Sequence, residues 1–159
     1  MQSDREKNPE LFFKAEKLCL RLLSVRQRSE KEIFDRLKFK GFGLSISKDV
    51  VGALRAGGLL DDKKFAEEWV DARLRMNPRS KSALEVELCA KGISIGTIEE
   101  VFAGRKKELE DRAIASKLIE SKMLSDKDPI DIKKKAKVYR FLLSKGIDRE
   151  IAEEMINEL

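Results

Sequence analysis

The aspartates between Asp126 and Asp131 have the spacing in this chain that most resembles a metal site. A calcium loop begins with acidic residues spaced in this way, and it also requires glycine at its sixth position and glutamate at its twelfth. The corresponding residues here are Asp131 and Lys137. We therefore predict no metal ligands in this segment. We interpret it instead as the start of a helix around Pro129, because proline is favourable in a first helical turn.

The chain contains two cysteines and no histidine, which restricts the chemistry open to it. Without histidine, neither a nucleophilic triad nor histidine-based acid–base catalysis can be assembled, and two cysteines alone do not make an ordinary zinc site. Cys19 and Cys89 each lie within an apolar helical pattern, so we expect both to be buried free thiols. We predict no catalytic residues, no cofactor and no enzymatic activity.

Gly41 and Gly43 could begin a glycine-rich dinucleotide loop, but the third glycine of that motif is missing. Its position is occupied by Ile46, and no parallel strand is predicted before Gly41. We interpret the two glycines as the end of a helix.

Basic side chains suggest contact with a charged partner. Six of them crowd one stretch with few acids nearby: Arg21, Arg26, Arg28, Arg36, Lys38 and Lys40. We expect this cluster to contact a partner or phosphate groups. The run Lys133-Lys134-Lys135-Ala136-Lys137 is a weaker candidate for a nucleic-acid patch. Consecutive helical residues point about 100° apart, so the run is more typical of a solvated helix surface.

The net charge of +5 is unevenly distributed along the 159 residues. Residues 14–60 carry 11 basic and 5 acidic side chains, a net charge of +6, whereas residues 61–104 carry 7 and 9, a net charge of −2. Residues 105–159 carry 14 and 12, a net charge of +2. A basic first part beside a slightly acidic second part indicates a polar molecule that meets a charged surface.

The elements that must position these side chains follow from an internal repeat. A Lys-Gly-apolar step occurs three times, at Lys40-Gly41-Phe42, Lys91-Gly92-Ile93 and Lys145-Gly146-Ile147. Apolar residues stand eight and four residues before each glycine: Ile33 and Leu37, Leu84 and Leu88, Val138 and Leu142. This spacing predicts one buried helical face that glycine ends by adopting a left-handed conformation. Further apolar pairs follow nine and ten residues after each glycine, so a second helix is expected there.

An earlier helix is expected in each repeat, because Ala15, Ala66 and Ala115 each precede a large apolar residue by three positions. Trp69, one of these apolar residues, is expected in the core beside Phe65 and Val70. We predict an all-α fold of three tandem three-helix repeats, at 10–60, 61–104 and 105–159, forming an elongated, curved molecule. The predicted helices are 10–25, 29–40, 46–57, 62–75, 80–91, 96–103, 105–123, 130–145 and 148–158.

Local signals support several of these helix boundaries. Ser29 and Ser80 both lie twelve residues before their glycine and can cap a first helical turn. Glu32, three residues after Ser29, has the spacing of a capping box. Leu59-Leu60-Asp61-Asp62 is predicted to close one repeat and to begin the next with acids that favour a helix N-terminus.

Composition also limits the class of protein. Apolar residues make up 42% and charged residues 40%, which favours helices around thin cores over a β protein or a disordered chain. Aromatic residues amount to 6%, so stacking platforms for single-stranded nucleic acid are not evident. No apolar run is long enough for a membrane span, and residues 1–6 lack the apolar core of a secretion signal. We expect a cytoplasmic protein that does not contact a membrane.

The motifs together resemble the RecX family of bacterial recombination regulators. The resemblance covers residues 15–102 and is carried by Leu22-Leu23, Arg26, Arg28-Ser29-Glu30, Leu37, Lys40-Gly41-Phe42, Gly58-Leu59-Leu60-Asp61-Asp62, Phe65-Ala66, Trp69-Val70, Arg73, Ser80 to Leu84, Glu87-Leu88 and Lys91-Gly92-Ile93. The segment from Leu59 to Trp69 is the most specific part. The last repeat matches through the repeat pattern more than through a motif.

The resemblance implies a protein without chemistry of its own that binds the RecA recombinase filament in DNA repair, recombination and the SOS response. We expect the protein to be a monomer. Such a protein restrains filament growth, ATP hydrolysis and strand exchange, and it binds DNA weakly if at all. Arg73 and Lys91, which belong to the matching motifs, join the six clustered cations as expected partner-binding residues. A helix-turn-helix DNA-binding protein remains the main alternative, and a helical scaffold for an unrelated partner is a third.

Overall fold

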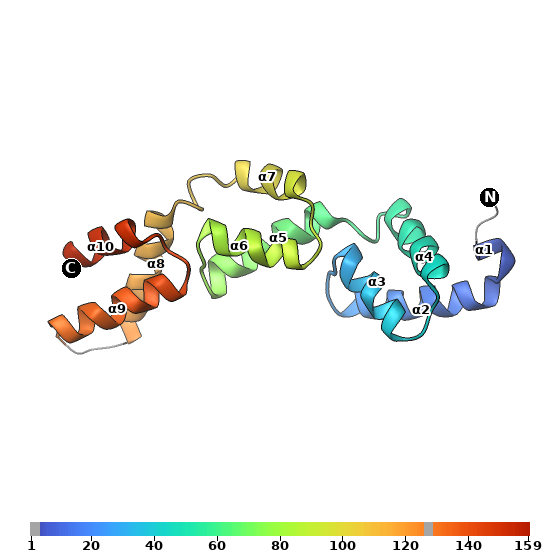
Figure 1. Cartoon of the computed structure of the whole chain (residues 1–159), viewed down its shortest axis with the longest axis horizontal. Coiled ribbons are helices and arrows are strands. Elements are labelled where there is room, and N and C mark those ends of the chain that lie inside the picture. Colours follow the sequence, from blue (N-terminus) through green and yellow to red (C-terminus); the bar gives the residue numbers. More distant parts are fainter. Residues whose placement is uncertain (1–3, 126–128) are drawn as a thin grey trace. The chain divides into compact units, whose positions relative to one another are not determined.

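A computed structural model of the chain describes residues 4–125 and 129–159, and the regular elements within these ranges are all α-helices (Figure 1). Residues 126–128 of the aspartate-rich segment lie outside the described residues. The helices are α1 Asp4–Lys7, α2 Pro9–Val25, α3 Glu30–Phe39, α4 Leu44–Ala56, α5 Asp62–Met76, α6 Lys81–Ala90, α7 Ile95–Ala103, α8 Asp111–Ser125, α9 Ile132–Ser144 and α10 Arg149–Asn157. The all-α prediction is confirmed.

The described residues form two compact units. Unit one comprises the described part of Met1–Ala66 together with Cys89–Thr97, and unit two comprises Glu67–Leu88 with the described part of Ile98–Leu159. Three helices, α5, α6 and α7, therefore contribute residues to both units. The division into three repeats stays a prediction.

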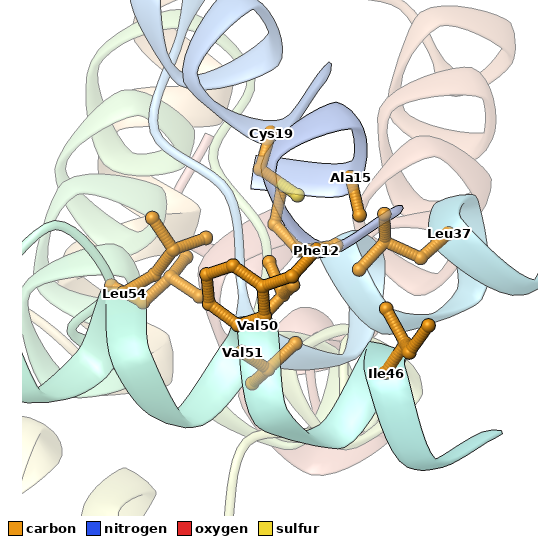
Figure 2. Close-up of a cluster of buried hydrophobic side chains, with 10 residues drawn as sticks. Phe12, Ala15, Cys19, Leu37, Ile46, Val50, Val51 and Leu54 are labelled. Atoms are coloured by element: carbon orange, nitrogen blue, oxygen red, sulfur yellow. The ribbon is translucent and has the colours of Figure 1, made fainter. Parts of the chain in front are cut away.

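The core of unit one lies between α2, α3 and α4. Figure 2 shows side chains of these three helices pointing toward one another. The cluster consists of Phe12, Ala15 and Cys19 from α2, Ile33 and Leu37 from α3, Ile46, Val50, Val51 and Leu54 from α4, and Leu60. Residues from one face of each helix thus supply the apolar burial that stabilises this unit.

The apolar positions predicted from the repeat are buried. The residues eight and four positions before each glycine are at most 1% exposed: Ile33, Leu37, Leu84, Leu88, Val138 and Leu142. Ala15, Ala66 and Ala115 are fully buried as well. Residues one helical turn apart lie on one face, so the spacing alone identified the buried side of α3, α6 and α9.

Glycine ends these three helices as predicted. Gly41, Gly92 and Gly146 have φ angles of 86°, 82° and 84°, a conformation that other residues rarely adopt. After α3, the Gly41 N–H donates to the Lys38 carbonyl and the Phe42 N–H to the Leu37 carbonyl, at 2.9 and 3.1 Å. This pair of hydrogen bonds is the Schellman motif, which satisfies carbonyls left open at the helix end.

Unit two has its own core, which includes the inner faces of α8, α9 and α10. The buried residues of these helices include Ile114, Ala115, Leu118, Ile119, Val138, Leu142, Ala152 and Met155. The guanidinium of Arg112 on α8 binds the carboxylate of Glu154 on α10, at 3.1 Å, and that of Glu158, which follows α10. These groups are exposed, so we assign the stability of the unit mainly to its apolar contacts.

Three details of the fold differ from the sequence prediction. The short helix α1, Asp4–Lys7, was not predicted. The helix expected at 105–123 begins only at Asp111, because Arg105-Lys106-Lys107 would place three cations at the positive end of a helix dipole. Cys19 is buried, and burial raises the pKa of its thiol to about 11, but Cys89 is exposed. Cys89 follows the buried Leu88 and so points about 100° away from the inner face of α6.

Within residues 4–125 and 129–159, we find no helix that is both long and apolar enough to cross a membrane.

Replacing Leu37 with alanine tests the core of unit one. Leu37 is fully buried, so Leu37→Ala should lower the free energy of unfolding by about 2 to 5 kcal/mol, measured by urea denaturation. Val25→Ala is the control in the same unit, since Val25 is 78% exposed, and it should change this free energy by about 0.5 kcal/mol or less. Equal effects of the two substitutions would contradict the assignment of Leu37 to the core.

Candidate partner-binding surface

Three of the predicted basic residues lie close together around one acid in unit one. Arg26 Nη1 lies 3.0 Å from Oε2 of Glu32, and Arg28 Nε donates to the carbonyl of Leu22 at 3.4 Å. Burial and the nearby charges of Arg26 and Arg36 lower the pKa of the Arg28 guanidinium, while Glu32 opposes this. Arg26, Arg28 and Arg36 thus form a single electrostatic group.

This group borders an open hollow on the surface of α2 and α3. Its lining consists of Leu22, Arg28, Glu32, Asp35, Arg36 and Phe39. Arg36 lies over the ring of Phe39, at 5.6 Å from its centroid. The hollow therefore combines cations and carboxylates with an aromatic side chain that is 79% exposed. This mixture suits a polar protein surface better than a phosphate backbone, because the two carboxylates would repel phosphate.

The remaining cations of the predicted cluster do not share that face. Lys38 lies on the other side of α3, with its ammonium group 5.8 Å from the ring centroid of Phe34. Arg21 on α2 and Lys40 at the end of α3 are exposed. Among the described residues, we find no ion pair for Arg21, Lys38 or Lys40. These three charges are accessible to a partner, although they do not form one stripe.

Lys91 has an internal role in unit one. Its ammonium group donates to Oε1 of Glu32 at 2.6 Å, and its carbonyl accepts a hydrogen bond from the Ser29 hydroxyl at 2.7 Å. Burial alone would raise the pKa of the Glu32 carboxyl. Hydrogen bonds from Arg26 and Lys91 together lower it by more than burial raises it, so the pKa lies below its ordinary value. Glu32 and Ser29 therefore connect α3 to the end of α6.

The capping prediction at α3 is confirmed for serine only. The Glu32 N–H donates to the Ser29 hydroxyl at 3.2 Å, as an N-cap requires. The Glu32 carboxylate, which the capping-box spacing would direct back to the helix start, instead binds Arg26 and Lys91. Ser80 caps α6 in the same way through the Ala83 N–H, also at 3.2 Å.

Arg73 lies in unit two and also has internal partners. Its Nε donates to Oε2 of Glu87 at 2.8 Å, and the Trp69 indole donates to the same oxygen at 2.9 Å. Arg79 forms an ion pair with the other oxygen of Glu87, at 3.2 Å, without hydrogen-bond geometry at its Nε. Trp69 is half-buried, whereas its neighbours Phe65 and Val70 are buried as predicted. Trp69 cannot enter the core fully because its N–H reaches a carboxylate at the surface.

A second contact in unit two resembles the one made by Lys91. The Ser80 N–H donates to the Lys145 carbonyl at 3.0 Å, and the Lys145 ammonium donates to Oδ1 of Asn77 at 2.6 Å. Sequence reasoning missed Glu32, Asn77 and Glu87 as partners of these cations. The sequence did contain a signal for both contacts. In two repeats a capping serine stands twelve residues before the glycine, and in all three repeats a lysine directly precedes the glycine.

The lysine run of α9 spreads around its helix, as predicted. Lys133 is exposed, Lys135 is half-buried and Lys134 is only 7% exposed. Within the described ranges, no cluster of acidic or cysteine side chains has the arrangement of a metal site. The groups that the structure presents are suited to binding through charge and apolar contact.

Comparison with known proteins identifies close relatives. Family models described as the first and second three-helix domains of RecX match residues 15–54 and 61–101. The chain is 39% identical over 121 residues to the regulatory protein RecX of Mycobacterium leprae (strain Br4923), covering 76% of this chain and 67% of that protein. Identity to the regulatory protein RecX of Mycobacterium avium (strain 104) is 32% over 146 residues, which cover 89% of this chain and 82% of that protein. A crystal structure of a regulatory protein RecX has a similar fold, with a TM-score of 0.77 and 22% sequence identity. The match covers 96% of this chain and 76% of that one.

The position of Glu32 predicts a pH-dependent contribution to stability. A carboxyl with a lowered pKa in the folded state stabilises the fold above its unfolded pKa, and this contribution is lost as the pH falls through the folded pKa. Glu32→Gln should therefore destabilise the protein most at neutral pH, and the difference from the parent protein should shrink as the solution is acidified. Urea unfolding between neutral and acidic pH measures this difference. Glu85→Gln, at an exposed residue, should follow the parent protein throughout. A Glu32→Gln deficit that stays constant with pH would contradict this role.

Proposed function

The chain belongs to the RecX family of regulatory proteins, and from this premise we propose that it binds the RecA recombinase filament. Binding restrains filament growth, ATP hydrolysis and strand exchange. The curated relatives carry the name regulatory protein, which supports a regulatory role rather than an enzymatic one. The function proposed for the molecule is thus that of a binding protein in DNA repair, recombination and the SOS response, acting in the cytoplasm.

The observation that carries this proposal is the accessible positive charge of unit one. Residues 14–60 have a net charge of +6, and the exposed cations Arg21, Lys38 and Lys40 make no ion pair among the described residues. Charges that a fold does not use internally are available to steer a partner of opposite sign. A RecA filament assembled on DNA carries the phosphate groups of that DNA, and we propose that acidic side chains of its protein surface also meet these cations.

The basic residues divide between two roles. We propose that Arg21, Arg36, Lys38 and Lys40 contact the partner, because they are exposed. Arg26, Arg28, Arg73 and Lys91 have internal partners, and we propose that they act mainly by holding the elements that present the surface. An ion pair that is partly shielded from water contributes more to geometry than an exposed one.

The proposed function makes a prediction that separates filament binding from simple DNA binding. At protein concentrations that barely retard duplex DNA in a gel, the protein should slow ATP hydrolysis and strand exchange by preformed RecA filaments. Binding to free DNA should be weak and should fall steeply with salt, because it depends on the release of counterions. Tight duplex binding without an effect on filaments would favour the helix-turn-helix alternative.

A charge-reversal experiment tests where the partner binds. The triple variant Arg21→Glu, Lys38→Glu and Lys40→Glu should associate with filaments roughly tenfold more slowly at low salt, because it reverses the steering field. The deficit should shrink at high salt, and the unfolding midpoint should be unchanged because the three side chains are exposed.

The matched control reverses three exposed lysines of unit two, Lys106, Lys107 and Lys133. It changes the net charge by the same amount, so any effect of total charge appears in both variants. Association that slows equally in the two variants would place the contact elsewhere than on unit one.

A further inference from the structure

Two of the three Lys-Gly steps are covered by the first turn of another helix. In unit one, Lys91-Gly92 at the end of α6 lies against the start of α3, and in unit two, Lys145-Gly146 at the end of α9 lies against the start of α6. Both contacts bring a helix C-terminus, where carbonyls are unsatisfied, to a helix N-terminus, where amides are unsatisfied. The partial charges at the two ends are opposite, so each pairing is favourable.

The two contacts use the same three residue types, a capping serine, a lysine and a glycine. A capping serine supplies the donor for the lysine carbonyl, through the Ser29 hydroxyl at 2.7 Å and the Ser80 N–H at 3.0 Å. The lysine ammonium reaches an oxygen of the same segment, on Glu32 or Asn77, at 2.6 Å in each case.

The third residue type is the glycine, which permits the close approach. A Cβ atom on Gly92 would lie 2.5 Å from Cβ of Lys31, and one on Gly146 would lie 2.5 Å from the Ser80 hydroxyl. A Lys-Gly step and a serine-capped helix start therefore form a complementary pair, which the chain uses twice.

The first Lys-Gly step has the same form and is uncovered. Gly41 has the same left-handed conformation, but a Cβ atom built there meets nothing within 4 Å. Lys40 is exposed, and among the described residues no hydrogen bond is donated to its carbonyl oxygen. This helix end therefore presents the carbonyl and the ammonium group that are both occupied in the other two steps.

The residue beside the uncovered step is also different. Two positions before the glycine, the covered steps carry small side chains, Ala90 and Ser144, whereas the uncovered step carries Phe39. Phe39 is 79% exposed and lies under the guanidinium of Arg36. A large exposed aromatic beside an arginine is the type of pair that anchors protein interfaces.

We propose that Phe39-Lys40-Gly41 is a docking surface for the N-terminus of a helix of the partner protein. The partner helix would carry a serine, threonine, asparagine or aspartate cap facing the Lys40 carbonyl, and an acidic or amide side chain facing the Lys40 ammonium group. An apolar side chain of the partner would pack on Phe39. This inference rests on the proposed function, since it takes the RecA filament as the partner.

The equivalent helix start of a second copy, that of α9, does not have the features that cover the other two Lys-Gly steps. Of the three helices that end in a Lys-Gly step, α9 is the one without a capping serine. Asp131 caps it instead, and lies fifteen residues before Gly146 rather than twelve. Lys134 stands where the other two starts have serine, and the exposed Lys133 adds positive charge next to it. Bringing this end against Lys40 would place like charges together, which disfavours association of copies through the start of α9.

The experiment compares two double variants of the full chain for binding to preformed RecA filaments. Phe39→Ala with Lys40→Glu removes the proposed anchor and reverses its charge. Ile132→Ala with Lys133→Glu makes the same kind of change at the start of α9, where Ile132 is 87% exposed. All four side chains are exposed, so circular dichroism and the urea midpoint should match those of the parent protein.

We expect the Phe39 and Lys40 variant to bind filaments about tenfold more weakly or worse, and the control to bind within about twofold of the parent. If the two variants bind equally well, the docking surface is wrong while the proposed function stands. If the parent protein does not bind filaments at all, the proposed function fails.

Photo-crosslinking identifies the occupant directly. Benzoylphenylalanine in place of Phe39 keeps an aromatic ring at the position, and crosslinked peptides are mapped by mass spectrometry after irradiation with filaments. Crosslinks should fall on RecA residues in the first turn of a capped helix. Crosslinks to a strand, to DNA or to a second copy of this chain would overturn the assignment of the occupant.

Discussion

The structure depends on how a helix can end inside a protein. The last carbonyls of α3, α6 and α9 need hydrogen-bond donors, and glycine in the left-handed conformation lets the following amides turn back to supply them. The same turn leaves the carbonyl of the preceding lysine facing outward. In two of the three cases a capped helix start supplies a donor to that carbonyl, so the end of one helix becomes the support of another.

The cations of this protein illustrate how burial divides similar residues between structure and binding. Lys91 and Lys145 each stand before a glycine and each reach an oxygen on another segment. Lys40 has the same place in its own repeat but is exposed. All three lysines belong to the same Lys-Gly-apolar step, so the difference in exposure comes from the neighbouring residues and elements and not from the lysine. A basic side chain can therefore be assigned to a function only after its surroundings are known.

Much of the fold could be predicted from the repeat, because its glycines and its apolar residues obey local rules. Spacings of four residues identified the inner faces of α3, α6 and α9, and glycine identified their ends. The late start of α8 and the exposure of Cys89 were missed, since they depend on the charge at a helix end and on the direction of a single side chain. The hydrogen bonds from Lys91 to Glu32 and from Arg73 to Glu87 join residues distant in sequence, and local rules do not describe such contacts. Of the candidate site, sequence predicted the basic residues but not which of them are occupied internally.

The hydrogen bonds that join Ser29 to Lys91 and Ser80 to Lys145 link residues far apart in the sequence, and this affects how the chain folds during synthesis. The hydroxyl of Ser29 binds the carbonyl of a residue 62 positions later in the chain. When the chain up to Leu60 has left the ribosome, it already contains every residue of the apolar cluster of unit one, but the partner of Ser29 has not yet been made. Early segments fold first on a growing chain, so the nascent protein passes through a stage with a formed core and an unoccupied helix start. The same holds for Ser80, whose partner Lys145 also lies in a later part of the chain. Both hydrogen bonds can therefore form only after the later segment has been synthesised.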